Sequence, residues 1–524
     1  MEIKIGNIES EIKYMDRLFS TNNHSELVIR GQILLKKFPK IVPFYNLLGL
    51  TYKKIGKQEE AIKVFKSCLF NEPHTISVMT NLADVYRDVN KLKESEELLL
   101  KVLKIKNKDI FALSSYGKLK RVQGKSQEAI IYFKKVAEID NSFDDVLIRI
   151  ASSYASINDF DNAKKYFEIA VYKNPTHIGA QYSYSQMIDY SNDKKHQEHM
   201  LKILDDSSLD KNKLGPMYFA IAKSFSDQKN YEEAHMYFKL ANDGMNNEVK
   251  NKILNREISD VKKLKSIFSN FDFKYNLSHL DLYRKNLVFI VGLPRTGTTL
   301  THQIIASHPS IRGVGESNVL HAYFVPNLKK ENFKSNFFKN NKLDEKYLSE
   351  LSLKLSNNYE YFSKDKIILD KSIYNFFWIG FIKIIFPNAK IIHMNRDIKD
   401  TALSIYNNLF GGKKMDWTYS QENIIRYIKI YKELMGFWKE KIPNYVYDLQ
   451  YEDLVNNQEE VSKKIIKFCD LEWNEKCLKF YESTSPVHTV SLHQARQPMY
   501  KKSVNLNSKY TKYQDFFDKL ENLK

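Results

Sequence analysis

Cysteine is scarce in this chain, which has only Cys68, Cys469 and Cys477 among 524 residues. Three thiols without a metal-ligand spacing exclude a disulfide framework and a zinc-finger arrangement, and reduced thiols are typical of the cytoplasm. Long apolar runs are also missing, since those at 287–291 and 376–382 are far shorter than the about 20 residues of a membrane helix. The first residues, Met-Glu-Ile-Lys-Ile-Gly-Asn, lack the apolar core of a secretory signal. We therefore expect a cytoplasmic protein without a membrane span.

A composition typical of disorder is absent as well, because 43% of the residues are hydrophobic and 13% are aromatic. The length exceeds what one hydrophobic core usually holds, which indicates two or more domains. The net charge of +18 would suit an anionic partner, but the lysines are scattered over helical polar faces instead of forming long blocks. No nucleic-acid-binding module is visible, so we expect no nucleic-acid partner.

The N-terminal half repeats with a period of 34 residues. Four positions of the repeat keep one kind of residue. Two of them are small, one suits a turn and one is large: Gly49, Ala83, Gly117 and Ala151; Ala61, Ser95, Ala129 and Ala163; Gly56, Asn90, Gly124 and Asn158; Phe65, Leu99, Phe133 and Phe167. Small residues fit where two antiparallel helices touch, and Gly or Asn fits a left-handed turn between them. This period and layout are typical of tetratricopeptide repeats.

We predict four clear repeats over 41–177, a looser one near 178–212 and another at 214–245, after a degenerate first unit over 8–40. A stack of this kind presents a concave surface that commonly binds a peptide or a protein. A purely structural or dimerising role is the alternative.

The predicted domains are an α-solenoid of about six to seven repeats over 1–247, a capping helix with a linker over 248–285, and a further domain over 286–524. Aromatic residues of the repeats are expected to pack in the seams between helices: Tyr116, Tyr154 and Tyr182.

Residues 286–300 read Asn-Leu-Val-Phe-Ile-Val-Gly-Leu-Pro-Arg-Thr-Gly-Thr-Thr-Leu. A strand, a loop bounded by Gly292 and Gly297, and a helix start form a layout whose backbone amides bind an anion. A P-loop that binds ATP would continue Gly-Lys-Ser/Thr, but Thr298 stands at the lysine position and the cation Arg295 lies inside the loop. We therefore predict a P-loop-like site for a phosphate or a sulfate. The alternative is an ordinary turn between a strand and a helix.

Strand-like and helix-like segments alternate after this loop. Strands are predicted at 366–369 and 390–394, and helices at 377–386 and 424–441. Alternation of this kind indicates a mostly parallel sheet with helices on both faces, and ligands then bind beyond the carboxyl ends of the strands. The predicted fold class is thus an α-solenoid followed by a P-loop-like α/β domain.

A second motif follows the strand at 390–394. Arg396 stands at the tip of the strand, and Ser404 lies eight residues further along the next helix. A guanidinium can form a forked pair with a phosphate, and a hydroxyl can add a donor. An Arg-Asp surface pair would be the simpler interpretation of this motif alone. With the anion loop in the same domain, a second phosphate site is the better one.

The pair of motifs, Gly-Leu-Pro-Arg-Thr-Gly-Thr-Thr-Leu and Arg-Asp-x6-Ser, resembles the 5′-phosphosulfate loop and the 3′-phosphate motif of sulfotransferases, which use 3′-phosphoadenylyl sulfate. The chain resembles bacterial tetratricopeptide-repeat sulfotransferases, whose catalytic domain is similar to tyrosylprotein sulfotransferases. The resemblance covers about 286–510 and most of 8–245. It implies Arg396 and Ser404 as ligands of the 3′-phosphate, and five residues around the 5′-phosphosulfate: Arg295, Thr296, Gly297, Thr298 and Thr299.

The same resemblance implies the catalytic residues. Gly-Val-Gly-Glu-Ser at 313–317 is similar to the segment that bears the catalytic carboxylate, which gives Glu316 as the base. Leu-Asp-Lys-Ser at 369–372 is similar to the segment with the catalytic lysine, which gives Lys371. Tyr451 opens a segment that lies near the nucleotide in this family.

The late segment 491–498 resembles the loop that closes over the phosphosulfate. The resemblance implies that Ser491 contacts the sulfuryl or bridging oxygen, and Lys502 and Lys509 are further candidates for this lid.

These residue types suit sulfuryl transfer. A carboxylate can take the proton of an acceptor hydroxyl. Arg295, Lys371, Ser491 and the loop amides can stabilise the charge that develops on the bridging oxygen. We expect in-line transfer to an acceptor hydroxyl with adenosine 3′,5′-bisphosphate as the leaving product and no metal.

Several alternatives stay open at this point. Glu316 could be a helix-start residue and Lys371 a surface lysine, and His393 is a rival base. The rival functions are a P-loop kinase or NTPase, which Thr298 opposes, and a non-catalytic repeat scaffold. The acceptor could be peptidyl tyrosine, another peptide, a sugar or a small metabolite docked on the concave surface, and a homodimer is left open.

Overall fold

The computed structural model describes residues 6–206, 209–246, 252–274, 286–331, 333–339, 342–364, 366–411, 413–483, 496–501 and 503–523. The chain divides into two compact units, Met1–Val146 and Leu147–Lys524.

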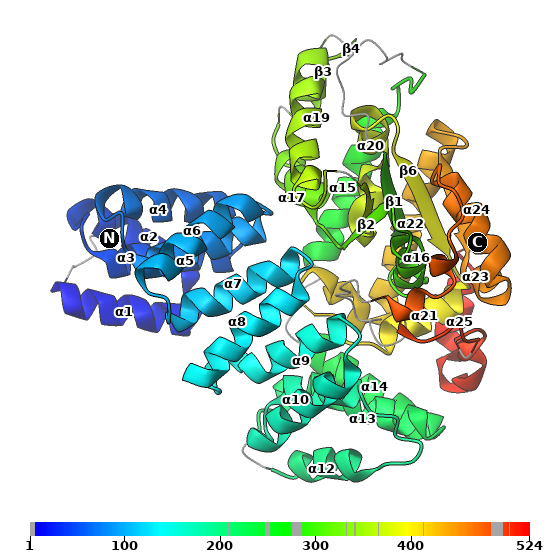
Figure 1. Ribbon diagram of the computed structural model, residues 1–524, viewed down its shortest axis with the longest axis horizontal. Coiled ribbons are helices and arrows are strands. Elements are labelled where there is room, and N and C mark those ends of the chain that lie inside the picture. Colours follow the sequence, from blue (N-terminus) through cyan, green and yellow to red (C-terminus); the bar gives the residue numbers. More distant parts are fainter. Residues whose placement is uncertain are drawn as a thin grey trace. The chain divides into compact units, whose positions relative to one another are not determined.

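The first unit is a row of helical hairpins, drawn from blue to cyan in Figure 1. Its helices are α1 (Ile8–Ser20), α2 (His24–Lys37), α3 (Val42–Lys54), α4 (Gln58–Asn71), α5 (Ile76–Asp88), α6 (Leu92–Ile105), α7 (Ile110–Val122) and α8 (Ser126–Ile139). The predicted first unit over 8–40 and the repeats that follow it are confirmed as helix pairs.

The repeat turns have the predicted left-handed backbone. Gly56, Asn90 and Gly124 have φ angles of 80°, 61° and 71°, and Asn22, one period before Gly56, has 59°. Only Gly and a few polar residues adopt this region at little cost, which explains why Gly and Asn share the position.

The small residues of the repeat lie where the two helices of a pair make contact. A Cβ atom on Gly49 would lie 2.4 Å from the Phe65 ring, and one on Gly117 would lie 2.6 Å from the Phe133 ring. No side chain fits at such distances, so the small residue and the large residue of the period are a matched packing pair.

The second unit begins with further repeat helices and a longer one that follows them. They are α9 (Val146–Ser156), α10 (Phe160–Lys173), α11 (Ile178–Ser185), α12 (Lys195–Leu204), α13 (Gly215–Asp227), α14 (Tyr231–Asn246) and α15 (Lys252–Phe268). The predicted looser repeat is the pair α11 and α12, in which α11 has only eight residues.

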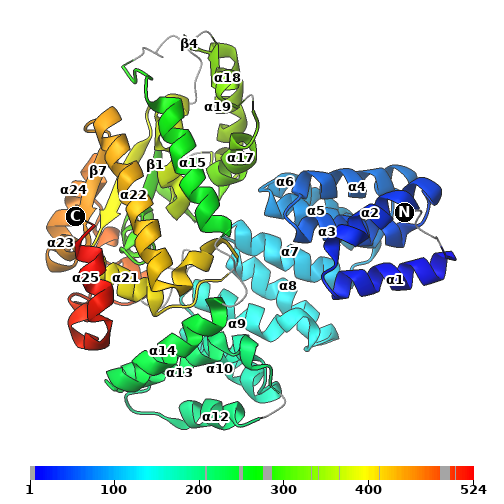
Figure 2. The same ribbon diagram turned by 180° about the vertical axis from the view of Figure 1, so that it is seen from behind.

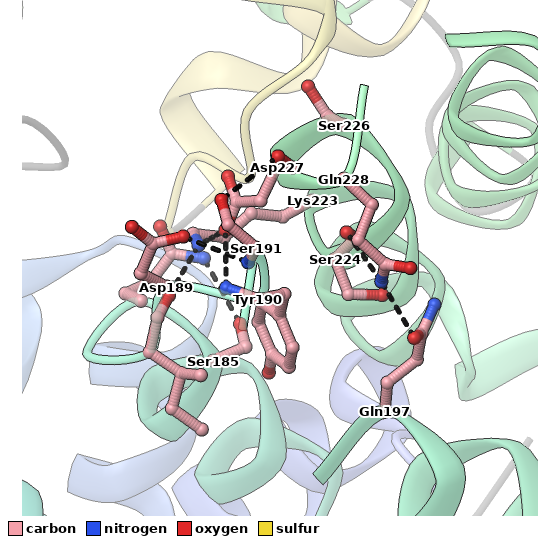
Figure 3. A network of polar contacts seen from close by, with 12 residues as sticks. Ser185, Asp189, Tyr190, Ser191, Gln197, Lys223, Ser224, Ser226, Asp227 and Gln228 are labelled. Atoms are coloured by element: carbon pink, nitrogen blue, oxygen red, sulfur yellow. Dashed lines mark hydrogen bonds and ion pairs between the residues drawn. The ribbon is translucent and has the colours of Figure 1, made fainter. Parts of the chain in front are cut away.

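The irregular segment between α11 and α12 is held to α13 by polar contacts (Figure 3). Lys223 Nζ donates to the carbonyl of Ile188 at 2.8 Å and pairs with Asp227 Oδ2 at 2.5 Å. Gln228 Nε2 donates to Gln197 Oε1 at 2.8 Å. These bonds fix the loose repeat to the next one, in addition to the apolar core that Ala180 and Tyr184 of α11 share with Met217 and Ile221 of α13.

A five-stranded parallel sheet forms the centre of the C-terminal part. Its order is β2 (Ile311–Gly315), β5 (Ile367–Asp370), β1 (Leu287–Gly292), β6 (Lys390–Asn395) and β7 (Val446–Gln450). Each neighbouring pair is parallel, which confirms the predicted sheet and the strands at β5 and β6. A separate antiparallel pair joins β3 (Phe338–Lys339) to β4 (Lys342–Leu343). The edge strands β2 and β7 were not predicted.

Helices cover both faces of this sheet, and Figure 2 shows α24 and α15 on opposite sides of it. Val288, Ile290 and Ile392 pack with α16 (Thr298–Ala306), α23 (Tyr451–Asn456) and α24 (Gln458–Phe468). Leu287 and Phe289 belong to the core on the other face. The elements of that face include η3 (Ile373–Trp378), α17 (Val319–Leu328), α18 (Phe333–Phe337), α19 (Glu345–Glu360), α20 (Ile379–Ile385), α21 (Ile398–Tyr406), η4 (Lys413–Tyr419), α22 (Gln421–Lys441) and α25 (Gln514–Glu521). The predicted helices at 377–386 and 424–441 are confirmed.

The last repeat shares a hydrophobic core with the sheet domain. Phe219 and Phe238 belong to the cluster that contains Leu287 and Phe289, and the ring centroid of Phe219 lies 6.2 Å from that of Tyr419. The later repeats are therefore an integral part of the second unit. In the described part of the chain, no helix combines the length and the apolar character needed to cross a bilayer.

Candidate active site

A tight loop joins β1 to α16. Arg295 and Gly297 have φ angles of 70° and 98°, so the backbone is left-handed at two places in the loop. A Cβ atom on Gly292 would lie 2.8 Å from Thr296 Oγ1, and one on Gly297 would lie 2.6 Å from the Tyr451 ring. Both positions require glycine, because a side chain at either one would clash with Thr296 or Tyr451.

The threonines of the loop lie at the start of α16. Thr298 and Thr299 are in its first turn and are buried, and Thr296 Oγ1 donates to the carbonyl of Leu293 at 2.8 Å. The first backbone N–H groups of a helix have no partner within the helix and favour an anion. The N-terminus of α16 thus has the geometry of an anion site, and the 5′-phosphosulfate assigned to it stays a prediction.

The second motif meets this loop. Arg295 Nε donates to Ser404 Oγ at 2.9 Å, and Arg396 Nη1 donates to the carbonyl of Arg295 at 2.8 Å. The Arg396 guanidinium lies 4.9 Å from the centroid of the Tyr451 ring, and Tyr451 also covers Gly297. Residues from three separate segments of the sequence are brought together at the carboxyl ends of β1 and β6.

The guanidinium groups of Arg295 and Arg396 are close enough for the positive charge of Arg396 to disfavour the protonated form of Arg295. Burial and the charge of Arg396 lower the pKa of Arg295 to about 10. Arg396 Nε is buried and has no hydrogen-bond partner in the described part of the chain. Asp400 Oδ2 lies 3.8 Å from Arg396 Nη2, while Asn507 donates to the other oxygen of Asp400 at 2.7 and 2.8 Å. Adjacent cations with an unused buried N–H suit a bound anion.

An acid–base pair lies at the ends of the neighbouring strands β2 and β5. Lys371 Nζ donates to Glu316 Oε1 at 2.6 Å. The Lys371 side chain is 2% exposed, whereas that of Glu316 is 47% exposed. The buried lysine therefore fixes one carboxylate oxygen of Glu316, and the Glu316 side chain remains accessible to a ligand. This arrangement differs from a surface lysine, which was the alternative for Lys371.

Asp370 locks the two strand ends that carry this pair. Ser317 Oγ and Tyr359 OH donate to Asp370 Oδ2 at 2.5 and 2.8 Å, and the Ser372 N–H donates to Asp370 Oδ1 at 2.8 Å. Asp370 is 1% exposed, and these donors provide hydrogen bonds to both of its buried oxygens. The sequence analysis did not single out Asp370, although it directly precedes Lys371.

His393, the rival base, is held by a different network. Its Nδ1 lies 2.6 Å from Asp448 Oδ1, and its Nε2 lies 2.6 Å from Tyr431 OH. Burial lowers the pKa of His393. The hydrogen bond between His393 and Asp448 lowers the pKa of Asp448. Both ring nitrogens are engaged, which makes His393 a link between β6, β7 and α22.

The predicted lid is only partly described. Ser491 and Lys502 lie outside the described residues, and Lys509 is exposed at the end of η8 (Leu506–Lys509). Ser503 contributes its carbonyl to Arg396 Nη2 at 2.5 Å. Burial raises the pKa of Tyr500, and the positive charges of Arg295 and Arg396 act in the opposite direction. No sequence pattern marked Tyr500 or Ser503 beforehand.

The repeats also reach this region. Burial raises the pKa of Tyr182 to about 12, and the charge of Arg295 and the N–H of Leu409 act in the opposite direction. Arg496 Nη2 donates to the carbonyl of Ser156 at 3.1 Å, between the repeats and the end of the lid segment. Tyr182 was expected in a seam between repeats, and no sequence pattern indicated this second environment.

The fold defines a class: a P-loop-like α/β domain joined to an α-solenoid. Residues 287–475 match the sulfotransferase family. Residues 42–70, 75–108 and 144–177 match tetratricopeptide repeats. The chain is a tetratricopeptide-repeat protein with a sulfotransferase-family domain.

Three similar proteins match either nearly the whole chain or less than half of it. An uncharacterised protein of Aquifex aeolicus is 25% identical over 96% of this chain and 74% of its own length. A putative protein-tyrosine sulfotransferase of Caenorhabditis briggsae is 22% identical over 38% of this chain and 70% of its own length. Protein-tyrosine sulfotransferase 1 of Danio rerio is 24% identical over 44% of this chain and 66% of its own length.

Proposed function

We propose that this chain transfers a sulfuryl group from 3′-phosphoadenylyl sulfate to an acceptor hydroxyl. The observation that supports it is the convergence of the Arg295–Ser404–Arg396 group with the Glu316–Lys371 pair at the carboxyl ends of four adjacent strands. An anion-binding part and a proton-accepting part thus share one edge of the sheet, where ligands of parallel sheets bind.

The donor is expected to span the two arginines. The loop at 292–299 and the start of α16 would hold the 5′-phosphosulfate, and Arg396 with Ser404 would hold the 3′-phosphate. Arg396 Nε has no hydrogen-bond partner among the described residues and fits this role, since a phosphate oxygen would complete its hydrogen bonding. Arg295 links the two sites through its bond to Ser404. Thr298, in place of a lysine, argues against ATP as the ligand.

The chemical step needs one proton acceptor and one group that stabilises the leaving oxygen. Glu316 takes the proton of the acceptor hydroxyl as the acceptor oxygen forms its bond to sulfur. The bond between sulfur and the bridging oxygen breaks, and its electron pair leaves with the 5′-phosphate of adenosine 3′,5′-bisphosphate. Arg295 and Lys371 stabilise that charge, and Ser491 is proposed to assist them.

The acceptor is proposed to be a peptide or protein hydroxyl, such as tyrosine, with a carbohydrate as the alternative. Two relatives are named protein-tyrosine sulfotransferases, and stacked repeats of this type commonly bind peptides. We place the repeats at 1–247, the capping helix and linker at 248–285 and the transferase at 286–524, and we propose a cytoplasmic enzyme that requires no metal.

Two substitutions separate the binding and catalytic roles. Arg396→Ala should weaken adenosine 3′,5′-bisphosphate binding by roughly 2–5 kcal/mol, because one or two charged hydrogen bonds are lost. Glu316→Gln should reduce turnover of labelled donor by about 10²–10⁴-fold, because the proton acceptor is removed. Its bisphosphate affinity should stay within about twofold of the wild type, because neither phosphate contacts Glu316 in this assignment.

A matched control is Arg426→Ala, since Arg426 bonds Asn255 at 2.9 Å outside the site. It should change neither binding nor turnover. An Arg396→Ala variant with wild-type affinity would remove the 3′-phosphate assignment, and a Glu316→Gln variant that turns over normally would remove the base.

A further inference from the structure

His302 connects the anion-binding helix to the strand that bears Glu316. It lies on α16, one turn after the loop threonines, and is 3% exposed. Its Nε2 accepts the N–H of Gly315 at 3.3 Å, at the long end of hydrogen-bond distances. A Cβ atom on Gly313 would lie 2.7 Å from the same nitrogen. The backbone of β2 therefore passes directly over the imidazole, and only glycine fits at position 313.

Gly315 is held from two sides. Its N–H donates to His302 on α16, and its carbonyl accepts the N–H of Lys371 at 2.8 Å. Its φ angle of 62° turns the chain at the residue before Glu316. The position from which the Glu316 side chain starts is thus set by one bond to the anion-binding helix and one bond to the segment that follows β5.

The protonation of His302 follows from its surroundings. Burial lowers the pKa of His302 to about 3, and the positive charges of Lys371 and Arg496 act in the same direction. The ring is therefore neutral near pH 7 and holds one proton. Because Nε2 accepts the Gly315 N–H, the proton must be on Nδ1.

The neighbour of Nδ1 agrees with this tautomer. The side-chain amide of Gln303 lies 3.1 Å from Nδ1, and Gln303 Oε1 has no hydrogen-bond partner in the described part of the chain when the amide nitrogen faces the ring. A half-turn of the amide fits the same space and brings Oε1 to the Nδ1 proton. The Nδ1 proton and Gln303 Oε1 then form a hydrogen bond, and the amide of Gln303 fixes the tautomer of His302.

We propose that His302 is a positioning residue for sulfuryl transfer. The neutral imidazole, with its proton on Nδ1, holds Gly315 against α16 and so keeps Glu316 at a fixed place relative to the bound donor. An imidazolium could not do this, since it has no acceptor for the Gly315 N–H. This inference rests on the proposed function, because it assigns a consequence to the position of Glu316.

Two substitutions test the proposal through the release of labelled sulfate from 3′-phosphoadenylyl sulfate, with water as the acceptor. His302→Phe keeps a ring but removes the acceptor, and kcat should fall about 10–100-fold, as expected for a small misplacement of a catalytic group. Adenosine 3′,5′-bisphosphate should bind within about twofold of the wild type, because the loop is untouched. His302→Gln, which can present an oxygen to Gly315, should recover most of the rate.

His196→Phe is the matched control. His196 is also buried, its pKa is lowered to about 4 by burial, and its partners Tyr190 and Gln181 belong to the repeats. It should lower stability without changing kcat. If His302→Phe keeps the wild-type kcat, or loses bisphosphate affinity in proportion to kcat, the positioning role is wrong.

A second measurement does not depend on catalysis or on the folding of a variant. Nitrogen-15 NMR of labelled histidine should show His302 with a proton on Nδ1 and no titration between about pH 5 and 8. A proton on Nε2, or titration within that range, would overturn the proposal. A wild-type protein that neither binds the bisphosphate nor releases sulfate would contradict the proposed function, while the tautomer would still report on the contact itself.

Discussion

The repeats of the two compact units have the same period but different packing partners. In the first unit, the core around Phe65, Leu48 and Leu82 consists of repeat residues alone. In the second unit, Phe219 and Phe238 of the last repeat pack in the core that also contains the sheet. The repeat pattern in the sequence therefore predicts how the two helices of a pair pack together. It does not predict which other part of the chain packs against that pair.

Hydrogen bonds also join the repeats of the second unit to its sheet-containing part. In the second unit, Asn242 Nδ2 donates to the carbonyl of Tyr406 at 2.9 Å, and Ser226 Oγ lies 2.8 Å from Tyr510 OH. Asn158 Nδ2 donates to the carbonyl of Tyr481 at 3.0 Å. Each of these bonds joins a repeat to the transferase part. We infer that residues 147–246 complete the transferase, whereas the first unit is separable from it.

Removal of the repeats should give the largest effect. A chain that begins at residue 147 should fold and bind adenosine 3′,5′-bisphosphate like the full chain, because it keeps a whole compact unit. A chain that begins at residue 252 should lose soluble expression and binding, because the core around Leu287 and Phe289 would lose Phe219 and Phe238. Soluble yield and calorimetric titration measure both outcomes. Normal bisphosphate binding by the chain that begins at residue 252 would show that the later repeats are not part of the transferase core.

Equivalent phenylalanines provide a sharper test. Phe65 in α4 and Phe238 in α14 occupy the same repeat position once a three-residue insertion is allowed for, and they are 0% and 4% exposed. Each change to Ala should cost about 3–5 kcal/mol of unfolding free energy, the usual range for a buried phenylalanine. Phe238→Ala should lower the unfolding transition that adenosine 3′,5′-bisphosphate stabilises, and Phe65→Ala should lower the other one.

Calorimetric unfolding with and without the bisphosphate distinguishes the two transitions. If both variants shift the ligand-responsive transition equally, the units are not thermodynamically separate.

Two buried glutamates predict opposite pH dependence. The bond from Arg30 to Glu11 at 2.6 Å lowers the pKa of Glu11, so its contribution to stability is present above pH 4.5 and is lost as the pH falls below that value. Burial raises the pKa of Glu257 from 4.5 to about 8, so its contribution is present at pH 4.5 and is lost as the pH rises towards 8.

Relative to wild type, Glu257→Gln should gain about 2–4 kcal/mol between pH 5 and 8, because glutamine has no proton to release. Glu11→Gln should be destabilised across that range and approach wild type below pH 4.5. Urea unfolding across pH gives both curves. Parallel curves for the two variants would contradict the assigned shifts.

The smallest expected effect concerns two turn asparagines. Asn90 and Asn158 have φ angles of 61° and 71°, and Asn158 also bonds Tyr481. Glycine keeps this backbone conformation, so Asn158→Gly should cost about 1 kcal/mol for the lost bond, and Asn90→Gly should be close to neutral. Unfolding midpoints compare them directly. Equal costs would mean that the contact with Tyr481 contributes nothing.

The fold was largely predictable because its main elements have strong local patterns. The repeat turns, the β1 loop and the central strands β5 and β6 were found from period, glycine placement and apolar runs. The edge strands β2 and β7 were missed because their exposed faces interrupt the apolar run, and β2 also contains Gly313 and Gly315. An edge strand is defined by its partner more than by its own sequence.

The candidate site was predictable to the extent that motifs carry it. Arg295, Arg396, Ser404 and Tyr451 do converge, and Glu316 does meet Lys371, while their roles stay predictions. His302, Tyr500 and the repeat residues Ser156 and Tyr182 had no motif, and Asp370 lay in the Leu-Asp-Lys-Ser segment without a predicted role. Their proximity arises only when strands and repeats distant in the chain pack together, which no local pattern records.

Calorimetric titration of the full chain with adenosine 3′,5′-bisphosphate, and separately with ATP and Mg²⁺, tests the central claim most directly. We predict one bisphosphate per chain, binding that does not require Mg²⁺, and at least about tenfold weaker binding of ATP, since the 3′-phosphate contacts of Arg396 and Ser404 are then unused. Tight binding of ATP with Mg²⁺ and no binding of the bisphosphate would contradict the account.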